Sequence, residues 1–205
     1  MPKSCKWIFA IILILPMAFA AGCDSRFGWV DQGRVIEYDK DQGTVTFIRD
    51  VSTDSKNPDY SHLPPVTYKL PADPHEMGPA PKVGKRMKLD LKNKQIVVYV
   101  PALNSFATIN YTLIDQKENI GSQDPLVYDA PTDSAIKFPI VDKFKKTITI
   151  YSKRQKTLTT FSVPDEYFAL ADDTWDNGDE VRVYYKEKGI AKRFMNISKT
   201  DIFKK

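Results

Sequence analysis

The sequence predicts an all-β protein in which two small five-stranded barrels follow one another after a removable leader. Strands are indicated by the composition: the 205 residues include 14 prolines, 12% are aromatic and 42% are hydrophobic, as in a folded chain of short strands and turns. The pair of barrels is indicated by an internal repeat, which spans most of the chain after the leader.

Residues 1–22 form the predicted leader. Lys3 and Lys6 precede an apolar run from Trp7 to Gly22 that ends in small residues, which is the order of a signal peptide. At about 1.5 Å per residue the run is short for the roughly 30 Å core of a bilayer, and Pro16 interrupts it. A retained transmembrane helix is the alternative.

The tetrapeptide AAGC at 20–23 resembles the lipobox of bacterial lipoproteins. The resemblance implies that the Cys23 thiol accepts a diacylglyceryl group and that Cys23 becomes the first residue after cleavage. The first alanine departs from the leucine usual at that place. The tripeptide AFA at 18–20 also fits an ordinary secretory site, but secretion would leave Cys23 as a lone thiol, because Cys5 lies in the leader.

Lipid at Cys23 would anchor the protein on the periplasmic side of a bacterial membrane. Asp24 is similar to the residue that keeps lipoproteins of enteric-type bacteria on the inner membrane, and the resemblance implies that location. Loss of residues 1–22 removes two lysines and no acid, so 30 basic and 26 acidic residues become 28 and 26. Each CH₂ of an acyl chain that enters the bilayer stabilises membrane attachment by about 0.8 kcal/mol. The lipid would therefore contribute more to membrane attachment than this small net charge.

The repeat gives the order of the elements. Asp39 pairs with Asp142 at an offset of 103 residues, and Gly84 pairs with Gly178 at an offset of 94. The matching stretches are 33–39 with 136–142, 44–47 with 147–150, and 66–71 with 159–164. Each copy therefore predicts strand, turn, strand, strand, polar connection, strand, turn, strand. The first copy carries an insertion at 50–65, which predicts an exposed loop.

Alternation along the chain supports the individual strands, since Val45 and Phe47 share one face and the threonines between them share the other. The connection 164–171 places Asp165 and Glu166 in a first helical turn. A five-stranded barrel with a short helix there is similar to the OB-fold, and an SH3-like barrel or a single sandwich is the alternative. We expect the following division: a lipidated tether at 23–32, a first barrel at 33–113 closed by a strand near 106–113, a linker at 114–134, and a second barrel at 135–205.

The sequence contains no G-x-S-x-G, G-x-G-x-x-G, Walker or H-E-x-x-H motif, so it predicts no enzyme activity, no metal and no cofactor. His62 and His75 lie in proline-rich loops. The acidic stretch 172–180 fails the EF-hand pattern, because Trp175 and Tyr184 stand where oxygen ligands are required. We expect a solvated turn there, with adventitious calcium binding as the alternative.

Clustered basic residues indicate a surface for an anionic partner. These residues are Lys143, Lys145, Lys146, Lys153, Arg154, Lys156, Lys192 and Arg193. On an OB-like barrel they would suggest single-stranded nucleic acid, but the predicted export excludes that partner. Anionic headgroups, an acidic glycan and an acidic protein fit, and a solvated face is the alternative.

The sequence thus predicts a non-enzymatic, lipid-anchored envelope protein that binds another envelope protein. The alternatives are an enzyme that acts on glycan or lipid with carboxylates such as Asp165 and Glu166, and a carrier of a small molecule or metal. No feature of the sequence indicates an oligomeric state.

Overall fold

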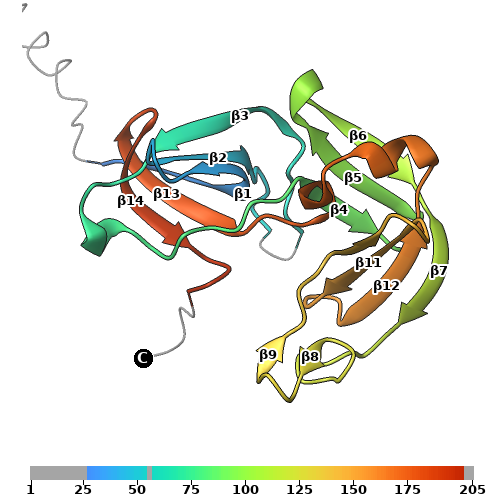
Figure 1. Cartoon of the computed structure of the whole chain (residues 1–205). Coiled ribbons are helices and arrows are strands. Elements are labelled where there is room, and N and C mark those ends of the chain that lie inside the picture. The colour runs from blue at the N-terminus through green and yellow to red at the C-terminus, as the bar shows by residue number, and fades with distance from the viewer. Residues whose placement is uncertain (1–26, 55–56, 201–205) are drawn as a thin grey trace, which may run out of the picture.

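The structure is a computed structural model that describes residues 27–54 and 57–200. It is all-β, as predicted, and its strands form two lobes (Figure 1). The leader, Cys23 and Asp24 lie outside the described residues.

The first lobe is a closed barrel of five strands, in the order β1-β13-β14-β3-β2. The strands are β1 (Trp29–Asp39), β2 (Thr44–Arg49), β3 (His62–Lys69), β13 (Glu180–Glu187) and β14 (Ile190–Asn196). β3 and β14 run parallel, and every other neighbouring pair is antiparallel. This is the order of an OB-like barrel. Apolar side chains that include Val35, Phe47 and Phe194 fill its interior.

The second lobe consists of two sheets. One contains β4 (Arg86–Asp90), β5 (Gln95–Val100) and β6 (Ser105–Asn110); the other has the order β10 (Ile140–Asp142), β11 (Thr147–Ser152), β12 (Thr157–Ser162) and β7 (Thr112–Lys117). Only Tyr111 separates β6 from β7, so one bent segment passes from the first sheet to the second. Side chains of both sheets, among them Ile96, Ile150 and Phe161, share one core with Trp175.

Short elements complete the fold. A small hairpin pairs β8 (Tyr128–Asp129) with β9 (Ser134–Ala135). The 3-10 helices are η2 (Pro74–Glu76), η3 (Pro101–Leu103), η4 (Asp165–Ala169) and η5 (Asp172–Trp175). The helical turn expected after Pro164 is therefore present, as a 3-10 helix.

The predicted division into tandem barrels at 33–113 and 135–205 is wrong, because each lobe takes strands from both halves of the chain. The barrel lobe combines β1, β2 and β3 with the last hairpin, β13–β14. The hairpin β4–β5 joins the second lobe with β10, β11 and β12. Both copies nevertheless follow the order that the repeat indicates, so the two copies have exchanged their last hairpins.

Smaller boundaries also differ from the prediction. Residues 29–32, expected in the tether, pair with β13 as part of β1. The strand near 106–113 belongs to the second lobe, and the expected linker at 114–134 includes most of β7 and all of β8. The loop 50–65 is not wholly exposed: Tyr60 is 6% exposed, since it packs in an apolar cluster between the lobes.

The exchange takes place where segments 82–86 and 176–180 cross side by side. Lys85 and Asn177 form an antiparallel bridge, which places Gly84 opposite Gly178. Amide hydrogen bonds from Asp179 to the Lys82 carbonyl (2.8 Å) and from Arg86 to the Asp176 carbonyl (2.9 Å) hold the segments together. A Cβ atom on Gly178 would overlap the Val35 carbonyl oxygen, and one on Gly84 would lie 2.5 Å from the Gly178 nitrogen.

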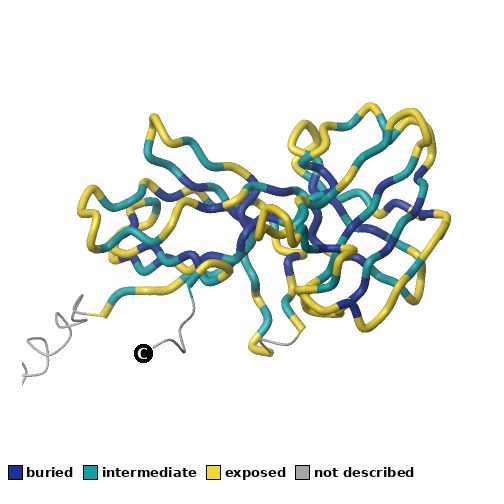
Figure 2. The backbone as a smooth tube through the Cα atoms, turned by 60° about the horizontal axis from the view of Figure 1, so that its bottom comes forward, coloured by how far each residue is buried: buried dark blue, intermediate teal, exposed yellow. Residues whose placement is uncertain are grey.

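A separate apolar cluster joins the lobes. Ile36, Ile48 and Tyr60 of the barrel lobe contact Met87 and Tyr99 of the second lobe, and each of the five side chains is at most 7% exposed. Buried stretches, coloured dark blue in Figure 2, run through both lobes and the neck between them. The lobes are therefore packed on each other through a buried apolar contact as well as through the crossing.

Replacement of Gly178 by alanine is expected to destabilise the protein by about 1–3 kcal/mol, because a Cβ atom has no room beside the Val35 carbonyl. Urea unfolding measures the effect as a lower midpoint. The control is Gly121→Ala, because a Cβ atom added at Gly121 would meet nothing within 4 Å beyond its chain neighbours. Its free energy of unfolding should stay within about 0.5 kcal/mol of that of the parent. Equal midpoints for the two variants would contradict the crowded crossing.

The chain exchange predicts which fragments fold. We expect a chain with residues 86–176 replaced by Asn-Gly to unfold cooperatively, because all five barrel strands remain and a two-residue turn suits the opposed Lys85 and Asn177. The fragment 27–113 should not unfold cooperatively, because it lacks β13 and β14. Without these strands the barrel core loses five side chains: Val181, Val183, Tyr185, Ala191 and Phe194. Thermal unfolding followed by circular dichroism distinguishes them, and a cooperative transition for 27–113 would contradict the topology.

Candidate functional site

A groove of about 1440 Å³ runs between the two lobes and is the candidate site. The barrel lobe contributes Arg34 and the loop around Tyr60, and the crossing segments contribute Lys82 and Asp179. The second lobe contributes the start of β4, the segment 135–139 before β10, and the turn between β11 and β12. Residues that are far apart in the sequence therefore meet in one place.

Arg34 connects the two walls of the groove. Its guanidinium carbon lies 4.3 Å from the centre of the Tyr60 ring, a cation–π distance. One Nη donates to the Met87 carbonyl (2.9 Å), and thus covers part of β4, which is an edge strand. Tyr60 in turn donates its hydroxyl to Glu180 (3.3 Å), and burial raises the pKa of Tyr60 to about 12.

Arg86 is a buried cation at the base of the groove and is 7% exposed. Its guanidinium donates to the Trp175 carbonyl and to the Asn177 side chain, each at 2.9 Å. No carboxylate of the described residues lies within ion-pair distance of it. Burial and, to a smaller extent, the nearby charge of Arg34 lower the pKa of Arg86 to about 10. Arg86 is thus still positively charged at neutral pH.

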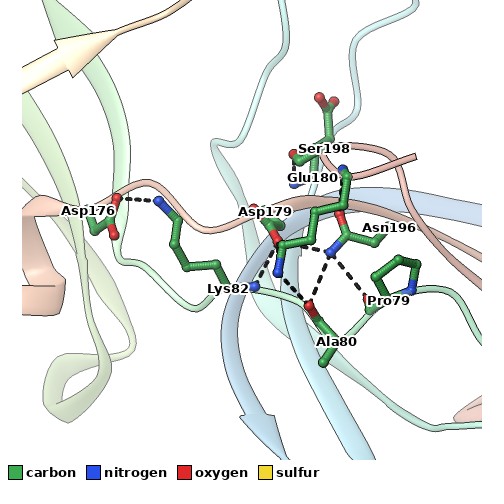
Figure 3. Close-up of polar contacts among 9 residues, drawn as sticks. Pro79, Ala80, Lys82, Asp176, Asp179, Glu180, Asn196 and Ser198 are labelled. Carbon is green, nitrogen blue, oxygen red and sulfur yellow. Dashed lines mark hydrogen bonds and ion pairs between the residues drawn. The ribbon is translucent and has the colours of Figure 1, made fainter. Parts of the chain in front are cut away.

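The acidic stretch 172–180 is not the solvated turn that the sequence suggested, since Trp175 and Asp179 are buried. Its carboxylates pair with lysines: Asp172 with Lys143 (3.3 Å), Asp173 with Lys85 (2.6 Å), Asp176 with Lys82 (2.8 Å) and Asp179 with Lys199 (3.4 Å). Figure 3 shows Asp179 between the Lys82 amide and the Asn196 side chain. Asp173, Asp176 and Asp179 therefore fasten the crossing segments, whereas Asp172 is exposed and pairs within the second lobe.

Metal binding finds no support in the part of the chain that the structure describes. Within it, no group of three or more histidine, cysteine, aspartate or glutamate side chains is placed to hold an ion. His62 and His75 are both exposed, at the start of β3 and in η2.

Positive charge is in excess along the groove. Five of its cationic side chains form no ion pair with any described acid: Arg34, Arg86, Lys137, Lys153 and Arg154. The acids at the crossing are neutralised by lysines, as described above. Asp59 also lines the groove, and hydrogen bonds from Ser61 lower the pKa of its carboxyl. The unpaired cations leave the groove with a net positive charge, and a hollow of net positive charge attracts anionic ligands.

The predicted basic surface is divided into three groups. Lys143, Lys145 and Lys146 lie in the turn between β10 and β11, and each pairs with an aspartate. Lys153, Arg154 and Lys156 lie in the turn at the opposite end of β11; of these, Lys153 and Arg154 line the groove.

The third group, Lys192 and Arg193, lies on β14 in the barrel lobe. There Arg193 hydrogen-bonds to Glu76 and holds the pKa of that carboxyl below its usual range. The eight residues therefore do not form the single patch that their clustering suggested.

Sequence reasoning missed Arg34, Tyr60 and Arg86, which stand alone in three distant segments. The available signal was weak: each arginine only precedes apolar residues in a strand that also contains other charges, at Arg34-Val35-Ile36 and at Arg86-Met87. Asp165 and Glu166, the carboxylates suggested for catalysis, lie in η4 and not on the groove wall.

Comparison with protein families gives one match. A family model with the description "Domain of unknown function (DUF4881)" matches residues 26–205. Neither the curated proteins nor the solved structures contain a match to the chain.

The buried phenol of Tyr60 predicts a loss of stability at alkaline pH. Its pKa is about 12 in the folded protein against 10.0 ordinarily, so its contribution is complete below pH 10 and is lost as pH rises through 12. The loss amounts to roughly 2–3 kcal/mol. We expect Tyr60→Phe to flatten the fall of unfolding free energy between pH 9 and 12 and to remove one late-ionising phenol from the ultraviolet titration. An unchanged titration would contradict the burial of Tyr60.

Proposed function

The chain belongs to the DUF4881 family, and we propose that this member is a lipid-anchored envelope protein that binds an acidic segment of another envelope protein in the groove between its lobes. The proposal has two parts, an anchor and a binding site. They are supported by different residues and are tested separately below.

The observation that carries the binding part is the set of unpaired cations in the groove. Arg34 and Arg86 are held in place by hydrogen bonds, so they need little reorganisation to meet an anion. Apolar surface from Phe106, Phe138 and Tyr151 lies beside them. Arginine together with aromatic side chains is typical of protein interfaces, and complementary charge speeds association and fixes orientation.

The anchor is supported by the sequence. The AAGC stretch at 20–23 fits lipid attachment at Cys23, and the family match begins at residue 26, beyond the leader. Asp24 favours the inner membrane, with the chain on its periplasmic side. Among the described residues, no helix has the length and apolar character needed to span a bilayer.

Binding is a better fit to the groove than the enzymatic alternative. Glycosidases need a pair of free carboxyl groups on either side of the scissile bond. In this groove Asp172, Asp173 and Asp176 are each in an ion pair with a lysine. Those contacts favour a structural role for the acids and leave the cations as the groups available to a partner.

Site-specific crosslinking in the native membrane tests the binding part. A photoreactive residue at Gln155, on the groove wall, should give a discrete adduct with a membrane or periplasmic protein. The same residue at Phe144, which is 96% exposed in the turn at the other end of β11, should give none. In the variant with the photoreactive residue at 155, the further substitutions Lys153→Glu and Arg154→Glu should weaken binding of the partner on the order of tenfold. The adduct at 155 should then disappear.

Equal crosslinking at 155 and 144, or an adduct that survives charge reversal, would contradict the groove as the binding site. The anchor is tested in the same cells by Cys23→Ser. This variant should lack the diacylglyceryl group in mass spectra and should leave the membrane fraction. A Cys23→Ser protein that stays in the membrane fraction would overturn the anchor and leave the groove result intact.

A further inference from the structure

Exposed apolar side chains gather at the end of the barrel where the described chain begins. Phe27 is 84% exposed, Trp29 58%, Val30 56% and Ile190 40%. Together with Lys186 and Lys188 we call these residues the N-terminal face.

Strand pairing brings the members of this face together. Trp29 lies opposite Tyr185 and Val30 opposite Tyr184, so the start of β1 adjoins the end of β13. Ile190 follows the turn from β13 and pairs with Glu187. In Figures 1 and 2 the first described residues enter at the end of the barrel lobe that points away from the second lobe. The face is therefore remote from the groove.

The charge on this face is mainly positive. Lys186 and Lys188 are exposed, and so are Lys69, which pairs with Ile190, and Lys192 on β14. Among residues 27–54 and 57–200, no acid forms an ion pair with any of these four lysines. Two acids lie near them: Glu187 pairs with Ile190, and Glu76, which pairs with Arg193, lines the same hollow as Val30 and Lys192. Aromatic side chains beside lysines are the combination found at membrane interfaces.

Chain length limits how far this face can lie from the proposed lipid. β1 begins at Trp29, so the barrel starts six residues after Cys23. The four residues from Cys23 to Phe27 span at most about 14 Å when fully extended. A lipid on Cys23 would therefore hold Phe27 and Trp29 close to the headgroups.

We propose that the N-terminal face rests on the phospholipid headgroups of the membrane that holds the lipid anchor. Trp29 and Phe27 enter the interface, and the lysines meet anionic phosphates. This inference rests on the proposed anchor at Cys23. It adds an orientation: the barrel lobe lies on the bilayer, and the second lobe projects away from it.

Fluorescence of Trp29 tests the contact. The chain has three tryptophans; Trp7 lies in the leader, and Trp175 is fully buried in the second lobe. The lipidated protein is reconstituted in vesicles of phosphatidylcholine and phosphatidylglycerol with or without brominated acyl chains. We expect brominated lipid to quench Trp29 and its emission to shift to shorter wavelength. The Trp29→Phe variant should show neither change, because Trp175 is out of reach of lipid.

Charge variants test the lysines in the same vesicles. Lys186→Glu with Lys188→Glu should reduce the quenching of Trp29 and remove its dependence on phosphatidylglycerol. The matched control, Lys117→Glu with Lys145→Glu, places the same charge change on the second lobe and should quench like the parent. Trp29 emission that is identical with brominated and ordinary lipid would overturn the proposal, as would equal effects of the two double variants.

A separate preparation distinguishes failure of this contact from failure of the anchor. The chain from Cys23 onward has a single thiol, which can be coupled to a maleimide phospholipid in the same vesicles. If the protein from cells carries no diacylglyceryl group, the proposed anchor at Cys23 is wrong. Quenching of Trp29 in the coupled preparation would still support contact of the N-terminal face with the bilayer. If Trp29 is not quenched in the coupled preparation, the proposed contact between the N-terminal face and the headgroups is wrong, whether or not cells attach lipid to Cys23.

Discussion

Close passage of two backbone segments at Gly84 and Gly178 is the contact on which both lobes depend. The barrel receives β13 and β14, and the second lobe receives β4 and β5, only because these segments can cross. Any side chain at Gly178 would meet the Val35 carbonyl. Lys82 and Lys85 stabilise the crossing through ion pairs with Asp176 and Asp173. The acidic stretch that the sequence suggests is a solvated turn therefore holds the two crossing segments together.

Local features of the fold were predictable because their causes are local. Asp39 and Asp142, equivalent in the repeat, each accept hydrogen bonds from two amides of the following turn, and alternation identifies the strands around them. The choice of partners was not predictable. Hairpins β4–β5 and β13–β14 have the same alternating pattern, so either could complete either half. The choice of hairpin depends on contacts between residues far apart in the sequence, such as Trp29 with Tyr185 and Lys69 with Ile190, and the periodicity of a strand does not record such contacts.

Candidate site residues illustrate the same limit. Clustering along the chain drew attention to Lys143, Lys145 and Lys146, yet distant or neighbouring aspartates neutralise all three. Lys153 and Arg154 were identified from the sequence and do line the groove. Arg34 and Arg86 lie in strands that also contain other charged residues, and only the packing of one lobe on the other places them together. Whether a charge is free to bind depends on its neighbours in space.

The shared barrel also sets an order for biogenesis. Synthesis delivers a chain from its N-terminus, and domains generally form as their residues become available. Strands β1 to β3 must wait for β14, which ends at Asn196, before the barrel can close, whereas segment 86–176 contains every strand of the second lobe. For a polypeptide that is threaded unfolded through a translocation pore, this arrangement keeps the leading part unfinished until nearly the whole chain has passed.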